Sequence, residues 1–290
     1  MANFRSLSEQ LYQKSTRFIY EIIQNAEDNE YKGSKKLPFL SFTLYSDRLI
    51  IDSNEDGFTK ENIKAICSIG ESTKASIQGY IGEKGIGFKS VFTVAHKVHI
   101  QSGCYSFAFE YSKNDDGKSG LGMVTPMNET PHELPGDVQT RMILYLHAGE
   151  DCGALYQELL NLPDTLLLFL KKLRQLTVNF ELPDRNVHQV QFSLTRPNND
   201  RLSENIVQTK TAITGAVNSV THKSFWVKKR PVFNLPADSA RGKIREAEVI
   251  LAFPIDEDHV PVIEEQYAFA FLPMKKTGYK VSQAGKLSNC

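Results

Sequence analysis

The sequence has few cysteines and does not group them. Cys67, Cys104, Cys152 and Cys290 are scattered, with no Cys-x-x-Cys spacing. This pattern excludes a disulfide framework and argues against a zinc site. No apolar run is long enough to span a bilayer, and the first residues lack the apolar core of a signal peptide. We therefore expect an intracellular protein, cytoplasmic or nuclear, without a membrane partner.

The chain also lacks an excess of charge of either sign. It contains 34 basic and 34 acidic residues among 290, so its formal net charge is zero. A dedicated nucleic-acid binder usually carries a clear basic excess, so nucleic acid is not an expected partner. A small anionic ligand held by a few groups is compatible with this balance. With 41% hydrophobic residues the composition is globular, and the length allows about two domains.

Hydrophobic periodicity and turn residues predict an α+β protein. A long helix is expected over 8–30, where apolar residues recur at helical spacing. Prolines and polar residues place a domain boundary near 183–200. Further helices are expected over 60–69, 88–95 and 154–173, the last interrupted near Pro163, and a loop over 113–137. Strands are expected over 39–45 and 48–52, joined as a hairpin through Ser46-Asp47, and over 97–101, 105–111, 140–147, 176–182, 187–195, 222–228, 246–253 and 267–272.

Three separated segments carry residues that suit one ligand site. The first lies in the long predicted helix, where Glu21, Asn25 and Asp28 stand at i, i+4 and i+7 and share one face. Two carboxylates and a carboxamide on one face can hold a hydrated Mg²⁺ and position a water. The alternative is a solvated polar face, which is the better interpretation for an isolated helix.

The second segment is rich in glycine and precedes a predicted helix. Gly82, Gly85 and Gly87 let backbone N–H groups approach phosphate oxygens, and Lys84 adds positive charge. The order Gly-x-x-Gly-x-Gly is the reverse of the dinucleotide fingerprint, and Gly-Lys-Ser/Thr is missing, so neither a Rossmann site nor a Walker A loop is predicted. Taken alone, a flexible glycine loop is an equal alternative.

The third segment, residues 50–59, runs from a predicted strand into a turn and a helix. A carboxylate or amide here can pair with the exocyclic amine of adenine. The alternative is an ordinary turn rich in aspartate and asparagine.

A further motif joins an aromatic residue to a basic cluster. Trp226, the chain's one tryptophan, is followed by Val227-Lys228-Lys229-Arg230. Such a segment can touch nucleic acid, but in a neutral chain a solvated strand end is the better interpretation.

In this order, the three segments resemble the ATP-binding fold shared by gyrase, heat shock protein 90, histidine kinases and MutL, the GHKL or Bergerat fold. Residues 54–58 (Asn-Glu-Asp-Gly-Phe), 65–74 (Ala-Ile-Cys-Ser-Ile-Gly-Glu-Ser-Thr-Lys) and 79–92 are similar to its sacsin and plant No Vein-like group. The resemblance is specific over about residues 15–110.

The resemblance also implies an architecture. It predicts a two-layer α/β sandwich that binds ATP over residues 1–182. A smaller, incomplete β-rich domain follows over 183–290, and its residues 282–290 form a disordered or atypical tail.

Roles follow from the matching positions. Glu21 matches the general base for the attacking water, Asn25 the Mg²⁺ ligand that bridges the phosphates, and Asp28 a supporting acid. The implied cofactors are ATP and Mg²⁺. The other matches are the lid opening at Ser72, Thr73 and Lys74, its phosphate-binding end at Gly82, Lys84, Gly85, Ile86, Gly87 and Phe88, the turn glycine Gly57, and Thr140 at the start of a core strand beneath adenine.

One motif departs from the family. The adenine-binding motif is Asp-x-Gly-x-Gly, whereas this chain has Asp52-Ser53-Asn54-Glu55-Asp56-Gly57. The first glycine is absent, and Asp52 stands one residue too far upstream. Either Asp52 reaches the base through a bulged turn, or Asn54 takes its place.

The resemblance implies an ATP-binding, chaperone-like module with slow Mg²⁺-dependent hydrolysis, a weak ATPase coupled to closure of a lid over residues 70–87. ATP and ADP are the expected ligands, with protein clients or self-association through the lid and second domain. The broken adenine motif favours an alternative, a non-catalytic scaffold with a degenerate nucleotide pocket. A chromatin- or nucleic-acid-associated ATPase of the same family is a further alternative, which charge neutrality weakens.

Overall fold

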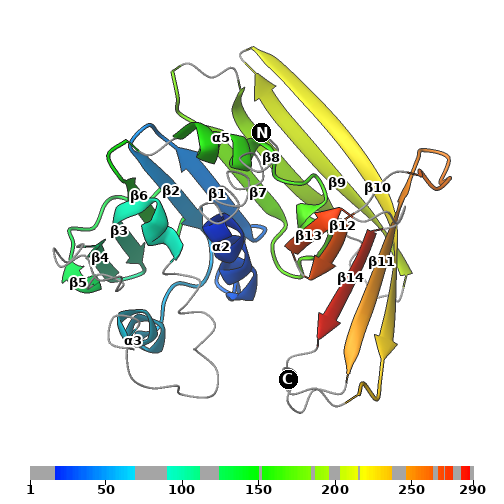
Figure 1. Ribbon diagram of the computed structural model, residues 1–290, viewed down its shortest axis with the longest axis horizontal. Helices are drawn as coiled ribbons and strands as arrows, with labels where there is room; N and C mark the ends of the chain where they lie inside the picture. The colour runs from blue at the N-terminus through cyan, green and yellow to red at the C-terminus, as the bar shows by residue number, and fades with distance from the viewer. Residues whose placement is uncertain are drawn as a thin grey trace, which may run out of the picture. The chain divides into compact units, whose positions relative to one another are not determined.

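The computed structural model describes most of the chain (Figure 1). The described residues are 17–68, 90–111, 124–149, 152–183, 187–195, 203–214, 216–236, 246–263, 267–270, 272–276 and 282–287. The chain divides into two compact units. One comprises Met1–Asn161 and Thr177–Gln189, and the other Leu162–Leu176 and Val190–Cys290.

Strands dominate the described residues, and helices are few and short. The helices are α2 (Arg17–Asp28), α3 (Lys60–Ser68) and α5 (Cys152–Leu160), with 3-10 turns η1 (Ser90–Thr93) and η2 (Leu166–Phe169). The strands are β1 (Phe39–Leu44), β2 (Arg48–Ser53), β3 (Ala95–Ser102), β4 (Tyr105–Tyr111), β5 (Val124–Asn128), β6 (Thr140–Leu146), β7 (Gln175–Phe180), β8 (Val187–Thr195), β9 (Ser203–Thr214), β10 (Val217–Val232), β11 (Ala247–Ile255), β12 (Tyr267–Ala270), β13 (Leu272–Lys276) and β14 (Ser282–Leu287).

These fourteen strands form one mixed sheet, in the order β13-β12-β14-β11-β10-β9-β8-β7-β1-β2-β6-β3-β4-β5. The expected two-layer α/β sandwich is therefore wrong. The reason lies in strands that the sequence pattern did not reveal. β9 pairs with β10 along its whole length and continues the hydrogen-bonded order beyond β8. The polar segment 282–290, expected as a tail, contains β14, which pairs with β11.

The hairpin of β1 and β2 confirms the two strands predicted over 39–45 and 48–52. Leu40, Phe42 and Leu44 alternate with half-buried residues along β1, and Phe42 lies opposite Ile51 of β2. The turn at Ser46-Asp47 is closed by a backbone hydrogen bond of 2.9 Å from the Tyr45 N–H to the Arg48 carbonyl. The two strands therefore present one apolar face and one more polar face.

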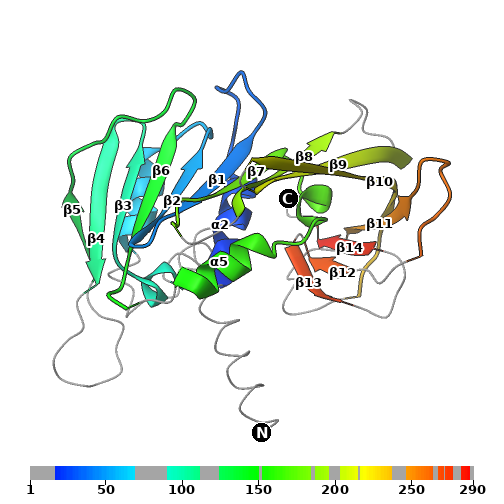
Figure 2. The ribbon, with the colours of Figure 1, turned by 90° about the horizontal axis from the view of Figure 1, so that it is seen from above.

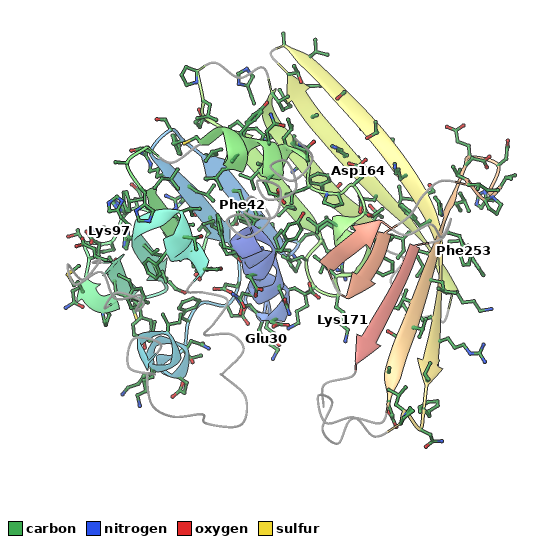
Figure 3. The ribbon with its side chains drawn as sticks, in the orientation of Figure 1. Glu30, Phe42, Lys97, Asp164, Lys171 and Phe253 are labelled. Carbon is green, nitrogen blue, oxygen red and sulfur yellow. The ribbon has the colours of Figure 1, made fainter. Side chains whose placement is uncertain are left out.

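Helices α2 and α5 lie on the same side of the sheet (Figure 2). One face of α2 is apolar and fully or almost fully buried, with Phe18, Ile19 and Ile23 completely inaccessible. Phe42 of β1 is also inaccessible, and Figure 3 shows it beside α2. This packing determines which edge of α2 faces away from the core.

The predicted helix over 60–69 is confirmed, and Thr59 caps its start. Thr59 Oγ1 accepts the Asn62 N–H at 3.2 Å, and Asn62 Oδ1 accepts the Thr59 N–H at 2.8 Å. This reciprocal pair satisfies two donors at the start of α3.

Two helix predictions are wrong in extent. Residues 88–95 were expected to be helical, but the described part forms the short turn η1 and then enters β3 at Ala95. Valines at 91 and 94 disfavour a helix because their branched side chains lose rotamer freedom there. The helix over 154–173 has its predicted interruption near Pro163: α5 ends at Leu160, and the chain does not resume an α-helix but forms the buried turn η2. The expected loop over 113–137 contains β5.

The second unit has its own apolar core. Alternate residues of β9, β10 and β11 are buried, and η2 adds Leu166, Leu167 and Leu168 to the interior. The buried strand residues are Ile206, Phe225, Val227, Ile250 and Ala252. One face of these three strands is therefore the core face.

Candidate functional site

The helix α2 carries the first group of candidate residues. Glu21 and Asn25 are half-buried, one helical turn apart, and Asp28 is exposed at the helix end. All three occupy one continuous helix whose opposite face packs in the core. The structure therefore places an acid and an amide together on a partly shielded edge of the helix.

Asp52 lies on the face of the sheet opposite to that of its neighbours Ile51 and Ser53, because side chains alternate along a strand. It stands opposite Arg141 of β6. Arg141 Nε donates to Oδ1 at 2.7 Å and Nη2 donates to Oδ2 at 2.8 Å, with the two side chains only 16% and 11% exposed. The hydrogen bonds to Asp52 raise the pKa of Arg141 above its usual value. Both Asp52 oxygens are engaged within the protein.

Asn54 is 1% exposed and joins the end of β2 to the segment before β1. Its Oδ1 accepts the Phe39 N–H at 2.8 Å, and its Nδ2 donates to Ser34 Oγ at 2.8 Å and to the Leu37 carbonyl at 3.0 Å. The amide group thus uses its donors and an acceptor position to hold residues 34–39.

The next two residues of the turn have the same kind of role. The Asp56 carboxylate accepts backbone N–H groups of Lys32 and Gly33 at 3.0 and 2.7 Å, and its own N–H donates to the Glu30 carbonyl. Glu55 accepts a hydrogen bond from Asn29 Nδ2. The triplet Asn54-Glu55-Asp56 therefore fastens the connection between α2 and β1 to the end of β2.

A cluster of buried hydroxyl groups lies at the ends of β2, β3 and β6. Ser102 Oγ and Thr140 Oγ1 are 2.6 Å apart, and Ser53 is paired with Thr140 in the sheet register. Ser102 Oγ also accepts the Phe58 N–H at 2.8 Å. Gly57 enables this contact, since its φ of +87° is in the left-handed region that favours glycine.

Tyr31 follows α2 and contacts the end of that helix. Its hydroxyl donates to the Ala26 carbonyl at 2.8 Å. Burial raises the pKa of Tyr31 above its usual value, and the carboxylates of Glu55 and Glu27 act in the same direction. The phenol therefore stays neutral and acts as a hydrogen-bond donor.

The glycine-rich segment and the expected lid lie outside the described residues. This applies to Ser72, Thr73, Lys74, Gly82, Lys84, Gly85, Ile86, Gly87 and Phe88. Of the predicted site residues, the structure describes Glu21, Asn25, Asp28, Asp52, Asn54, Gly57 and Thr140.

Sequence reasoning missed several residues of this region. Ser53 had a signal, because counting four residues back from Gly57 gives position 53, where the adenine motif has its aspartate. Ser102 and Arg141 had none, because their proximity to Thr140 and Asp52 depends on strand register. Tyr31 also had none, since its contacts arise from the turn after α2.

The opposite face of β3 carries a second polar cluster that holds a loop. Gln101 accepts the His132 N–H and donates to the His132 carbonyl, both at 2.8 Å. His99, only 1% exposed, lies 2.9 Å through Nε2 from Ser106 Oγ, and its ring centroid is 5.3 Å from that of His132. Lys97, labelled in Figure 3, pairs with Glu129 at 2.7 Å.

This arrangement predicts a pH-dependent stability. Burial lowers the pKa of His99 below its usual value, and the nearby His132 adds to the effect. The unfolded chain therefore binds a proton at a higher pH than the folded protein does. As the pH falls from 7 to 5, the free energy of unfolding should decrease, by at most about 1.4 kcal/mol per pH unit for this one group.

Urea denaturation at several pH values measures the effect. The His99→Gln variant should show a smaller pH dependence than the wild type. The control is His222→Gln, which changes an exposed histidine and should leave the dependence unchanged. An identical pH dependence in His99→Gln and wild type would contradict the assignment.

Two further properties bear on ligands. Among the described residues, no group of three or more His, Cys, Asp or Glu side chains is placed to hold a metal ion. In the same part of the chain, no helix is long and apolar enough to cross a membrane.

No family model matches this chain, but comparison with known proteins finds a similar protein. The similar protein is Protein NO VEIN of Arabidopsis thaliana, which is 31% identical over 300 residues. The match covers 94% of this chain and 10% of the Arabidopsis protein. The chain thus spans about a tenth of the length of that relative.

Proposed function

We propose that the chain is a GHKL-type, heat-shock-protein-90-like ATP-binding module with slow Mg²⁺-dependent hydrolysis that drives a conformational change, as in a chaperone. The observation that carries this proposal is the edge of α2. Glu21 and Asn25 stand one turn apart, half-buried, on a helix whose other face is locked in the core. The glycine-rich segment 79–90 supports the proposal as a phosphate-binding loop.

The residues fit a magnesium–nucleotide complex better than a free metal ion. The described residues offer no cluster of three metal-binding side chains. Mg²⁺ commonly takes one or two protein ligands and completes its shell with phosphate oxygens and water. A single amide on α2 is sufficient for that arrangement, and when bound the ion neutralises charge on the phosphates.

In this proposal each residue of α2 has a separate role. Asn25 Oδ1 binds the metal and so positions the phosphates. Glu21, on the adjacent turn, accepts a proton from the attacking water and orients it. Asp28, exposed at the helix end, supports the site by its charge.

In this proposal the adenine base is contacted by residues other than Asp52 and Asn54, the two candidates of the sequence motif. Asp52 is paired with Arg141 on the opposite face, and Asn54 holds the segment before β1. Ser53 and Thr140 lie on the face that the helices cover. We infer that these hydroxyl groups contact the base, with Ser102 positioning Thr140 through their hydrogen bond of 2.6 Å.

One alternative is favoured by the same observations. A scaffold with a degenerate pocket would use Asp52 and Asn54 only to stabilise the fold, as their contacts indicate. Such a protein would bind no nucleotide, so a binding measurement separates the two functions.

Calorimetry with ATP, with and without Mg²⁺, tests the proposal. Asn25→Ala should weaken binding of the magnesium complex by about tenfold or more, because it removes a metal ligand. Glu21→Ala should still bind, but its phosphate release should fall by about a hundredfold or more, because it removes the general base.

The matched control is Gln24→Ala, which changes an exposed residue of the same helix. It should leave both affinity and turnover unchanged. Absence of ATP binding by the wild type, or binding that does not depend on Asn25, would overturn the proposal and favour the scaffold.

A further inference from the structure

The strand β11 is apolar on both of its faces. Ile250 and Ala252 point into the core of the second unit and are buried. The alternate residues Val249, Leu251 and Phe253 point to the other face and are only half-buried. Strands that are apolar on both sides are typical of sheets covered on both faces. This pattern therefore predicts that something covers the second face of β11.

The neighbouring strand β10 extends this apolar face. Trp226 lies opposite Phe253 in the register, and their ring centroids are 5.4 Å apart. Trp226 remains 39% exposed and Val207 of β9 is also exposed. Figure 3 labels Phe253 on β11. We call this surface of Val207, Trp226, Lys228, Arg230, Leu251 and Phe253 the outer face.

The charged residues of the outer face have one sign. On β10 and β11, the positions that share a face with Trp226 include the cations Lys228 and Arg230 and no acid. Lys228 lies opposite Leu251 and Arg230 opposite Val249, so neither faces a carboxylate across the strands. The Lys228 Nζ is 6.0 Å from the centre of the Trp226 ring. The face is therefore apolar and positively charged, although the whole chain is neutral.

We propose that the outer face binds a protein segment that carries acidic and large apolar side chains. The apolar side chains cover Trp226, Phe253 and Leu251, and the carboxylates pair with Lys228 and Arg230. A nucleic acid is less well matched, because two cations release few counterions, whereas specific nucleic-acid binders contact many phosphates. Aromatic anchors with an adjacent arginine are the groups that contribute most to protein interfaces.

The single tryptophan makes the test direct, since Trp226 is the only source of indole fluorescence. The probe is a synthetic peptide of alternating Glu and Leu residues around one Phe. The wild-type protein should bind it with a shift of the Trp226 emission. In Lys228→Glu/Arg230→Glu, the affinity should fall about tenfold or more because attraction becomes repulsion.

The control variant Lys35→Glu/Lys60→Glu makes the same charge change at exposed positions elsewhere and should keep the wild-type affinity within about twofold. A peptide with Gln in place of Glu should bind at least about tenfold more weakly than the acidic one. Equal binding by both double variants, no binding by the wild type, or tighter binding of an oligothymidine than of the peptide would overturn the proposal. Thermal denaturation verifies that both variants fold.

Discussion

Replacing Arg141 with alanine is expected to lower the free energy of unfolding by about 3 kcal/mol or more, since it leaves a largely buried carboxylate without its partner. Asp52 is 11% exposed and receives two hydrogen bonds from the guanidinium. The cost comes from the charge that remains, because few water molecules can reach it. Urea denaturation at neutral pH measures this change.

Two controls separate the charge from the packing. In the double variant Asp52→Leu/Arg141→Met both charges are removed, and the free energy should return to within about 1 kcal/mol of the wild type. The exposed pair of Lys32 and Glu30, with side chains 82% and 55% exposed, provides a comparison, and Lys32→Ala should cost less than about 0.5 kcal/mol.

The same variants test the function of Asp52. If Asp52 only stabilises the sheet, the folded double variant should bind ATP as the wild type does. If Asp52 contacts adenine, Arg141→Ala should be close to wild type in stability, and Asp52→Leu should abolish nucleotide binding. That second outcome would contradict the assignment made from the strand faces.

Replacing Asn54 with alanine is expected to lower the free energy of unfolding by about 2–4 kcal/mol, because it removes three hydrogen bonds from a buried amide and leaves partners unpaired. The Phe39 N–H at the start of β1 loses its acceptor, and the Leu37 carbonyl loses a donor. The loss should also loosen the segment 34–39, which hydrogen exchange of its backbone amides would report.

Asn54→Asp is the informative second variant. It keeps an acceptor for the Phe39 N–H but turns a negative oxygen toward the Leu37 carbonyl, so it should remain destabilised. Asn161→Ala, which changes an exposed asparagine, should have an effect below about 0.5 kcal/mol. Wild-type stability in both Asn54 variants, with loss of ATP binding, would instead make Asn54 a nucleotide ligand.

Both residues illustrate why the candidate site was only partly predictable. The sequence motif identified the turn after β2 as important, but it could not tell a ligand contact from a structural contact. Whether each residue makes a structural contact depends on partners that are distant in the chain. These partners are Arg141 for Asp52, and Phe39 with Leu37 for Asn54. Ser53 was not identified as a site residue for a related reason. The sheet face on which a strand residue lies is known only once the pairing of that strand is known.

Local patterns were sufficient for the elements whose signals lie within a few residues. The apolar stripe of α2, the β1–β2 hairpin and the cap of α3 at Thr59 follow from spacing and from residue type. They also bring Glu21, Asn25 and Asp28 onto one helix. The helix geometry alone determines that relation, since residues three or four apart share a face.

The tertiary structure decided how these elements combine. Whether the strands form one sheet or two depends on β9, β8, β7 and β1 being neighbours in the hydrogen-bonded order, a relation that no short window of sequence contains. It also decided that one side of β11 stays half-exposed while the other is buried. The sequence by itself determined the polar edge of a helix, the turn and a neutral composition. Pairing between distant strands then determined that Asp52 is held by Arg141 and stabilises the fold.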